Sequence, residues 1–274
     1  MQLGIHLPQA GSQATPQLIR RHAMRAEALG LSDVWVSEHI IVPRQEFPRS
    51  PLFYDPLMTL SWVAAVTERV RLGTSVIVLP MRHPLPLAKE LSTLQNLSGG
   101  RLILGVGVGW LEAEFKALGA PFHERGRRMD EGIAMMRAVW SEDPVTFEAR
   151  YIPAEIRGLT MLPQPIRPIP MWHGSRSEPA HRRTVRIGDG WHGTGTPEEV
   201  KPIIARLRRD RPEPDFTISV RSHWDGRDQG VMSERLAAFA EAGVQHVMVH
   251  PQDREVDDWD SVIEAVGRLA GPVH

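Results

Sequence analysis

The sequence contains no cysteine. Disulfide bonds, zinc–thiolate sites, iron–sulfur clusters and cysteine nucleophiles are therefore excluded. Neither sign of charge is in excess, because 32 Lys and Arg residues stand against 33 Asp and Glu residues. A chain without an overall positive field is not expected to bind nucleic acid. Its 274 residues, 42% of them hydrophobic and 24% charged, suit one large globular domain or two small ones.

Long apolar runs are also missing. No segment approaches the roughly 20 apolar residues that a helix needs to cross a bilayer. The first residues, Met1 to Pro8, lack a basic segment followed by an apolar run, so they predict a strand and not a signal peptide. We therefore expect a cytoplasmic protein without a membrane partner.

A regular alternation of short apolar runs and amphipathic helices fills the chain. The first run covers Gln2 to Leu7, and the helix after it begins at Thr15 and Pro16 and ends at Gly30. Thr before Pro is a helix start signal, and Gly is a stop signal. The other predicted strands are 33–37, 70–78, 102–106, 170–172, 190–192, 216–220 and 246–249. The other predicted helices are 55–64, 87–97, 127–140, 179–187, 196–207, 233–242 and 258–269.

Eight strand–helix units predict an α/β fold, a (β/α)₈ TIM barrel formed as a single domain by residues 1–274. An open dinucleotide-binding sheet would have a glycine-rich turn after its first strand, whereas the segment Leu7 to Gly11 is Leu-Pro-Gln-Ala-Gly. A proline-rich segment from Pro144 to Pro170 predicts an insertion of strands and turns between strands four and five.

Active sites of such barrels lie at the carboxyl ends of the strands. Glu38 and His39 follow the second strand, and an imidazole at a cavity mouth can exchange a proton near neutral pH. The alternative for His39 is a hydrogen bond to a loop carbonyl. For Glu38, a role as a surface partner is favoured over that of a catalytic acid.

Two further strand ends are candidates for ligand binding. Gly107, Gly109 and Trp110 end the fourth strand, where glycine lets a flat ligand approach the backbone, although such glycines also serve turns and close packing. Gly174, Ser175 and Arg176 lie between strand five and its helix. Free backbone N–H groups and a guanidinium there favour phosphate, the alternative being a capped turn with an exposed arginine.

The chain resembles the luciferase-like monooxygenase superfamily, particularly its coenzyme F420 (deazaflavin)-dependent oxidoreductase branch. The resemblance covers residues 1 to about 195 in the family's order. The matching segments are LGIHLP (3–8), WVSEH (35–39), VRLGTSV (70–76), LAKELSTL (87–94), the block from GGRL (99–102) to GVGVGW (105–110), EF and LG (114–115, 118–119), IPMW (169–172) and GDGW (188–191). Each segment is weak alone, and the ordered set is specific.

The resemblance implies a ring-shaped cofactor at the strand ends, supported by a bulge with a non-prolyl cis peptide between Ser75 and Val76. It implies that the cofactor's phosphate-bearing tail runs toward the loop after strand five. The residues expected to bind the cofactor are His39, Ser75, Val76, Gly107, Gly109, Trp110, Gly174, Ser175 and Arg176.

The resemblance also implies roles in catalysis. His39 is expected to transfer a proton or to orient the substrate, with Glu38 standing where the family commonly has aspartate. One branch of the family has a glutamate proton donor where this chain has Trp110, so we do not expect its sugar-phosphate chemistry.

The expected function is hydride transfer between coenzyme F420 and a small organic molecule. FMN with monooxygenation is the alternative, and the arginine-rich composition favours F420. A flavin-binding relative whose cavity Trp110 closes, and a metal-dependent barrel hydrolase, are less favoured. Substrate choice is expected to depend on the connections 40–54 and 144–170, of which the first is also a candidate interface of a homodimer.

Overall fold

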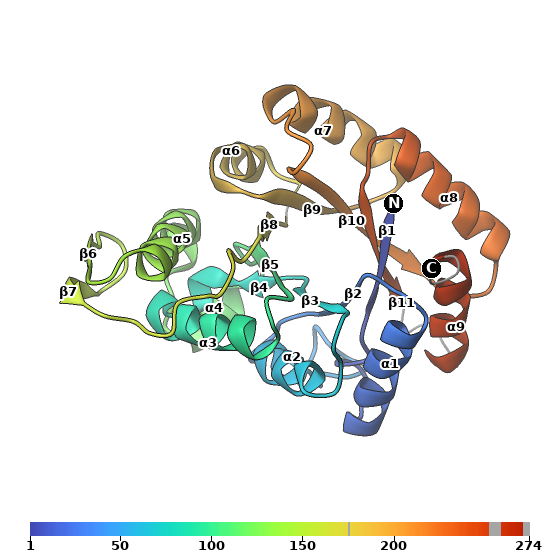
Figure 1. The fold of residues 1–274 in the computed structure, drawn as a ribbon, viewed down its shortest axis with the longest axis horizontal. Coiled ribbons are helices and arrows are strands. Elements are labelled where there is room, and N and C mark those ends of the chain that lie inside the picture. Colours follow the sequence, from blue (N-terminus) through green and yellow to red (C-terminus); the bar gives the residue numbers. More distant parts are fainter. Residues whose placement is uncertain (175, 252–258, 271–274) are drawn as a thin grey trace.

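The computed structural model describes residues 1–174, 176–251 and 259–270. Within them, eight parallel strand positions close into a barrel in the order β1-β2-β3-β5-β8-β9-β10-β11, with β11 paired to β1 (Figure 1). The strands are β1 Gln2–His6, β2 Asp33–Val36, β3 Arg71–Thr74, β4 Ile77–Val78, β5 Leu102–Gly107, β8 Met171–His173, β9 Gly190–Thr194, β10 Thr217–Trp224 and β11 His246–Pro251. The predicted (β/α)₈ barrel is confirmed.

The helices lie outside the strands, as the alternation requires (Figure 1). They are α1 Pro16–Ala28, α2 Pro56–Ala64, α3 Pro84–Leu97, α4 Glu112–Ala117, α5 Arg125–Ser141, α6 Glu178–Ile187, α7 Pro197–Asp210, α8 Gln229–Glu241 and α9 Trp259–Ala270, with short 3₁₀ turns η1 Leu79–Met81 and η2 Phe122–Glu124. Thr15 accepts a hydrogen bond from the Leu18 N–H and Asp55 accepts from the Leu57 N–H, so the predicted N-caps are confirmed. None of the described helices has both the length and the apolar character needed to cross a bilayer.

The predicted insertion is an antiparallel hairpin of β6 Val145–Glu148 and β7 Glu155–Leu159. It projects from the barrel next to α5, at the left of Figure 1. The prediction of strands and turns in this segment is therefore confirmed.

One predicted strand has the wrong bounds, and one helix was not predicted. The run 70–78 is not one strand: β3 ends at Thr74, the Ser75–Val76 peptide is cis, and β4 then pairs with β5. The run is mostly apolar on both sides of Ser75, so its composition predicts one strand, and only the family resemblance indicated a bulge at Ser75 and Val76. The short helix α4 was not predicted, because only Glu114 and Phe115 of its six residues are buried and no apolar stripe forms.

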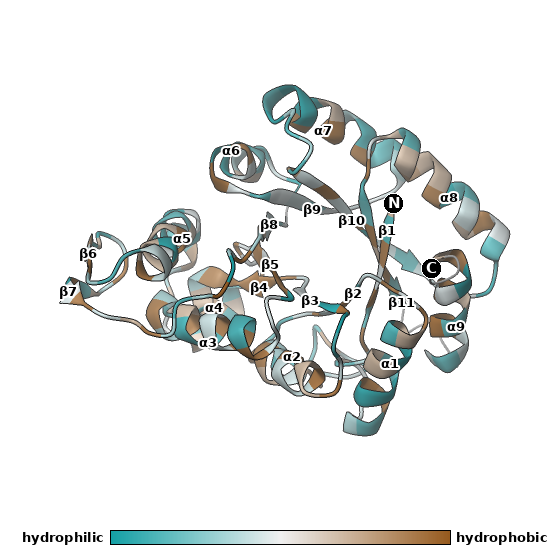
Figure 2. Cartoon of the chain, viewed as in Figure 1, coloured by the Kyte–Doolittle hydropathy of each residue, from teal (hydrophilic) through white to brown (hydrophobic). Residues whose placement is uncertain are grey.

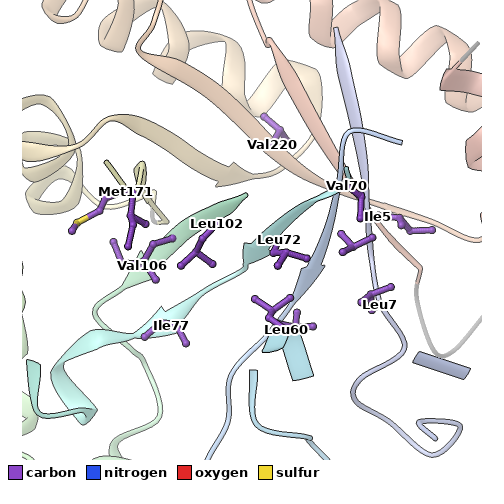
Figure 3. Packing of buried hydrophobic residues seen from close by; sticks show 14 of the residues in the cluster. Ile5, Leu7, Leu60, Val70, Leu72, Ile77, Leu102, Val106, Met171 and Val220 are labelled. Carbon is purple, nitrogen blue, oxygen red and sulfur yellow. The ribbon is translucent and has the colours of Figure 1, made fainter. Parts of the chain in front are cut away.

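The apolar core lies between the strands and the helices. Outward-facing strand residues such as Ile5, Leu72 and Leu102 are buried in one cluster with helix residues such as Leu60 of α2 (Figure 3). Hydrophobic residues follow the strands and the adjacent helix faces, whereas hydrophilic residues lie outside (Figure 2). This layer holds the helices against the barrel.

The barrel interior, in contrast, is strongly polar at the end where the strands begin. The buried Asp33 carboxylate accepts hydrogen bonds from Trp35 Nε1 (2.5 Å), His246 Nε2 (2.8 Å) and Arg71 Nη2 (2.7 Å). Burial alone would raise the pKa of Asp33, but His246 and Arg71 hold it well below its usual range. The carboxylate is therefore a fixed negative charge inside the barrel.

A chain of hydrogen bonds leads from that carboxylate toward the carboxyl ends of the strands. The Ser219 hydroxyl hydrogen-bonds with Nδ1 of His246 and with Nδ1 of His192, at 2.7 Å each. Nε2 of His192 then hydrogen-bonds with the Ser75 hydroxyl at 2.9 Å. Trp35 stacks on the His192 ring with centroids 4.9 Å apart and planes inclined by 6°. The interior side chains thus fix the position of Ser75, the residue that follows β3.

The buried histidines make stability sensitive to acid. Burial lowers the pKa of His6, of His173 and of His192 to about 3 each. Unfolded histidine takes up a proton near pH 6.5, so the unfolded state binds more protons than the folded state between about pH 6.5 and 3. We expect the free energy of unfolding to fall with falling pH across this window, by about 1.4 kcal/mol per pH unit for each such histidine, as measured by urea unfolding.

Paired substitutions isolate the effect. His173→Leu removes one buried histidine whose ring nitrogens have no hydrogen-bond partner in the part of the chain that the structure describes, and we expect it to reduce the pH slope by the share of one proton. His123→Leu changes an exposed histidine and serves as the control. A stability that stays level from pH 6.5 to 4, or equal slopes for both variants, would contradict the prediction.

Candidate active site

A cavity of about 600 Å³ opens at the carboxyl ends of the barrel strands. Its lining includes His6 of β1, Ser75 after β3, Gly107 of β5, Arg221 of β10 and His250 of β11, so residues from all sides of the barrel meet there. A cavity of this size at this face is where a small ligand binds in folds of this type.

Eight of the ten predicted site residues line this cavity: Glu38, His39, Ser75, Val76, Gly107, Gly109, Trp110 and Gly174. Arg176 is not among the lining residues, and its guanidinium lies 3.6 Å from Glu199, with both side chains nearly half exposed. Such an exposed pair contributes little energy and does not compete strongly with a phosphate. Ser175 lies outside the described residues.

His39 is oriented by a carboxylate that the sequence did not reveal as a site residue. Its Nδ1 lies 3.1 Å from Oε2 of Glu114 on α4. The other oxygen of Glu114 accepts hydrogen bonds from the backbone N–H groups of Ile40 (2.5 Å) and Ile41 (3.1 Å). Burial raises the pKa of Glu114, but His39 and these two N–H groups outweigh burial, and the net shift is downward. A carboxylate at this place favours the tautomer of His39 that carries its proton on Nδ1.

Glu38 is buried and held on both oxygens. Oε2 accepts from the Val78 N–H at 2.5 Å, and Oε1 accepts from Arg82 Nε at 2.6 Å, while Arg82 also binds Asp55. Burial raises the pKa of Glu38, against the opposing effects of Arg82 and the Val78 N–H. The interpretation of Glu38 as a surface partner is wrong, since only 4% of the residue is exposed. Its contacts favour the positioning of β4 over direct catalysis.

The cis peptide implied by the family resemblance is present between Ser75 and Val76. Glycines surround the bulge that it forms. A Cβ at Gly107 would lie 2.7 Å from a Val76 methyl, and one at Gly174 would lie 2.9 Å from the other. At Gly105 a Cβ would lie 1.9 Å from the Thr74 carbonyl oxygen. These glycines therefore make room for Val76, which itself lines the cavity, and any contact of theirs with a ligand is additional.

The remaining wall next to His39 is aromatic. The imidazole has edge contacts with Phe47, Phe53 and Trp110, whose ring centroids lie 5.0, 4.9 and 6.1 Å away. Trp110 is 64% exposed at the rim, so it leaves the cavity open. Phe47 and Phe53 belong to the connection 40–54 that was expected to shape the substrate pocket. No residue of the connection 144–170 is among the described lining residues.

The wall formed by β1, β10 and β11 carries nitrogen groups that sequence reasoning did not select as site residues. The rings of His6 and His250 have centroids 4.4 Å apart, and His250 Nδ1 lies 3.2 Å from His223 Nδ1. Burial, and next the Arg221 cation, lower the pKa of His223 to about 4. Charged or polar residues at every second position of the predicted strand 216–220, continued through Arg221 and His223, were the available signal.

Comparison with known proteins places these observations in a family. The family described as "Luciferase-like monooxygenase" matches residues 1–265. An uncharacterised protein of Mycobacterium tuberculosis is 32% identical over 83% of the chain and 82% of its own length. An F420-dependent glucose-6-phosphate dehydrogenase of Intrasporangium calvum is 33% identical over 84% of the chain and 72% of its own length.

Solved structures share the barrel. An F420-dependent secondary alcohol dehydrogenase, in complex with an F420-acetone adduct, superimposes with a TM-score of 0.83 at 18% identity over 99% of both chains. The monooxygenase RslO1 from Streptomyces bottropensis does so with a TM-score of 0.73 at 22% identity, over 98% of this chain and 96% of its own. At these identities the similarity establishes the fold.

The contacts of Glu114 generate a test of this part of the site. Glu114→Ala leaves two backbone N–H groups without an acceptor, and we expect it to lower the free energy of unfolding by about 2–4 kcal/mol. Glu114→Gln keeps one carbonyl oxygen and is expected to cost about half as much. Urea unfolding measures the loss, and hydrogen exchange reports the Ile40 and Ile41 amides directly.

Glu112→Ala is the matched control, because Glu112 is exposed on the same helix, and its effect should stay within about 0.5 kcal/mol. Equal effects of Glu112→Ala and Glu114→Ala, with unchanged exchange at residues 40 and 41, would show that the carboxylate does not hold this loop.

Proposed function

Because the chain belongs to the luciferase-like monooxygenase family, in the branch of F420-dependent enzymes, we propose that it transfers a hydride between coenzyme F420 and a small organic molecule. Its relatives include F420-dependent dehydrogenases and do not favour FMN, the alternative cofactor. The observation that carries the proposal is the Val76 bulge in an open cavity with the His39–Glu114 pair beside it.

The residues of the cavity fit a flat ring. Val76 presents an apolar side chain to the cavity, and the glycines that pack around it, Gly107 and Gly174, add no side chain that would fill the space in front of it. The volume of about 600 Å³ accommodates a tricyclic ring and a small second molecule. We propose that Ser75, Val76 and Gly107 support the ring and that the loop around Gly174 and Arg176 receives the phosphate.

The cofactor supplies the hydride chemistry when it is bound. The chain's own residues orient the reactants and handle the proton. His39, whose Nδ1 is committed to Glu114, offers Nε2 to the oxygen of a substrate as donor or acceptor. Phe47, Phe53 and Trp110 contact the His39 imidazole, which is 16% exposed, and so limit its contact with water.

The other interpretations receive less support. Trp110 does not close the cavity, which removes the main argument for a relative without catalysis. Within the described part of the chain, no three His, Asp or Glu side chains gather as ligands of a metal ion, as a metal-dependent hydrolase would require. The homodimer and the cytoplasmic location stay predictions.

Titration of the purified protein with F420 and with FMN tests the proposal. We expect F420 to bind at least about tenfold more tightly than FMN, since the bulge and the phosphate loop are proposed to fit the deazaflavin. The fluorescence of each coenzyme reports its binding, and displacement of one by the other shows whether they share the cavity. Failure of F420 to bind, or tighter binding of FMN, would remove the basis of the proposal.

Arg176→Gln tests the phosphate assignment. If this guanidinium binds the phosphate, the variant should bind F420 about tenfold more weakly, and its affinity for the deazaflavin chromophore without the phosphate-bearing tail should not change. Arg182→Gln, an exposed arginine of α6, is the control. Equal F420 affinities of Arg176→Gln and the parent protein would place the phosphate elsewhere.

A further inference from the structure

Arg221 is an arginine inside the barrel. Side chains alternate along a strand, and Ser219 of β10 points inward, because it hydrogen-bonds with His192 and His246 of the interior chain. Arg221 follows two residues later on the same side and lines the cavity above that chain. Its guanidinium therefore belongs to the active-site wall and not to the outer surface.

This cation has no counter-ion among the described residues. The structure shows no hydrogen bond and no ion pair of the Arg221 guanidinium there, and its Nε is buried without a partner. Two other largely enclosed arginines are paired with carboxylates: Arg82 binds Glu38 and Asp55, and Arg183 binds Asp130. Burial lowers the pKa of Arg221 to about 10, so it stays a cation at neutral pH. A buried unpaired charge is costly, and proteins keep one where a ligand completes the pair.

The neighbouring imidazoles add no second positive charge. Burial lowers the pKa of His6 to about 3 and that of His250 well below its usual value, with Arg221 contributing to both shifts. Both rings line the cavity together with Arg221. The described part of this wall therefore carries one positive charge beside neutral imidazoles. Both ring nitrogens of His6 already hydrogen-bond, with the Leu7 carbonyl and the Ser37 hydroxyl at 2.7 Å each, so His6 contributes its ring and no free donor or acceptor.

We infer that Arg221 binds the carboxylate of the organic substrate, with His6 and His250 beside it. The inference rests on the proposed function, since it assigns the second molecule of that reaction. In the strand order, β10 and β11 stand across the barrel from β3 and β5, which carry the Val76 bulge. The ring and the carboxylate thus occupy opposite walls, and the substrate between them faces the ring.

A carboxylate suits this wall better than a phosphate does. The planar guanidinium binds two oxygens of a carboxylate at once, and a charge of −1 neutralises the single cation. A phosphate monoester carries about −1.5 to −2 at neutral pH and would leave uncompensated negative charge among neutral imidazoles. The substrate class is accordingly a small organic carboxylic acid.

Benzoate and benzamide, which differ in charge and little in shape, are suitable probes on the protein without cofactor. We expect benzoate to raise the unfolding temperature in a concentration-dependent way and benzamide and inorganic phosphate to have little effect. Arg221→Met should weaken benzoate binding about tenfold or more. Arg221→Lys keeps the charge but loses the planar group that binds two oxygens at once, so it should have an intermediate effect. Arg157→Met, at an arginine that is 81% exposed on β7, should leave benzoate binding unchanged.

Stability of the unliganded variant gives an independent readout. Arg221→Met removes a largely enclosed charge that has no counter-ion among the described residues, so its unfolding temperature without ligand should equal or exceed that of the parent protein. An unfolding temperature lower by several degrees would show that Arg221 serves the fold, and would overturn the inference.

F420 titration of the same proteins separates this inference from the proposed function. If F420 binds the parent protein and benzoate does not, the carboxylate site is wrong and the proposed function stands. If benzoate binds through Arg221 and F420 does not bind, the proposed function fails and the anion site stands without its reaction. Equal binding of phosphate and benzoate overturns the carboxylate assignment. Tenfold weaker F420 binding by Arg221→Met, with benzoate and F420 competing, assigns Arg221 to the cofactor and overturns the inference as well.

Discussion

A buried carboxylate at one end of the barrel fixes the arrangement of the cavity at the other. Asp33 holds His246, Ser219 links His246 to His192, and His192 reaches Ser75, at distances of 2.7 to 2.9 Å. Each of these groups is buried, so each must keep its partner or leave a polar atom unsatisfied. The chain of bonds therefore determines where β3 ends, and the Val76 bulge that faces the cavity follows directly from that position.

Polar side chains of this hydrogen-bonded chain occupy interior positions that apolar side chains could fill. A barrel of this size can be filled with branched aliphatic side chains alone, whereas here Trp35, Trp172, Ile103 and Met248 form only a small apolar cluster within it. His192, which burial keeps neutral, stacks on Trp35 of that cluster, and Arg221 is kept charged above it. Each of these groups costs stability in the empty protein, and such groups are retained where a ligand or a reaction uses them.

The sequence predicted the parts of the molecule that local chemistry controls. Thr15 and Asp55 cap their helices because the residues that follow fit a first turn, and strand ends converge because the fold is a parallel barrel. It did not predict features that depend on contacts distant in the chain. Glu114 contacts His39, which is 75 residues away in the sequence. The burial of Glu38 depends on its ion pair with Arg82, which is 44 residues away. That Arg221 has no counter-ion among the described residues depends on the whole interior, and no local pattern in the sequence indicates it.

The two walls of the cavity differ in how many substitutions they can accept. The ring wall depends on backbone positions around Val76, where any side chain at Gly105 would overlap the Thr74 carbonyl oxygen, so it tolerates little change. The facing wall and the connection 40–54 contribute side chains, among them Phe47, Phe53 and Arg221, that can be exchanged without moving the backbone. A barrel built in this way can keep one cofactor and change its substrate. On our proposal, the charge of Arg221 and the shape that Phe47 and Phe53 give to the space beside His39 select the substrate of this chain, and both are properties of side chains and not of the backbone around Val76.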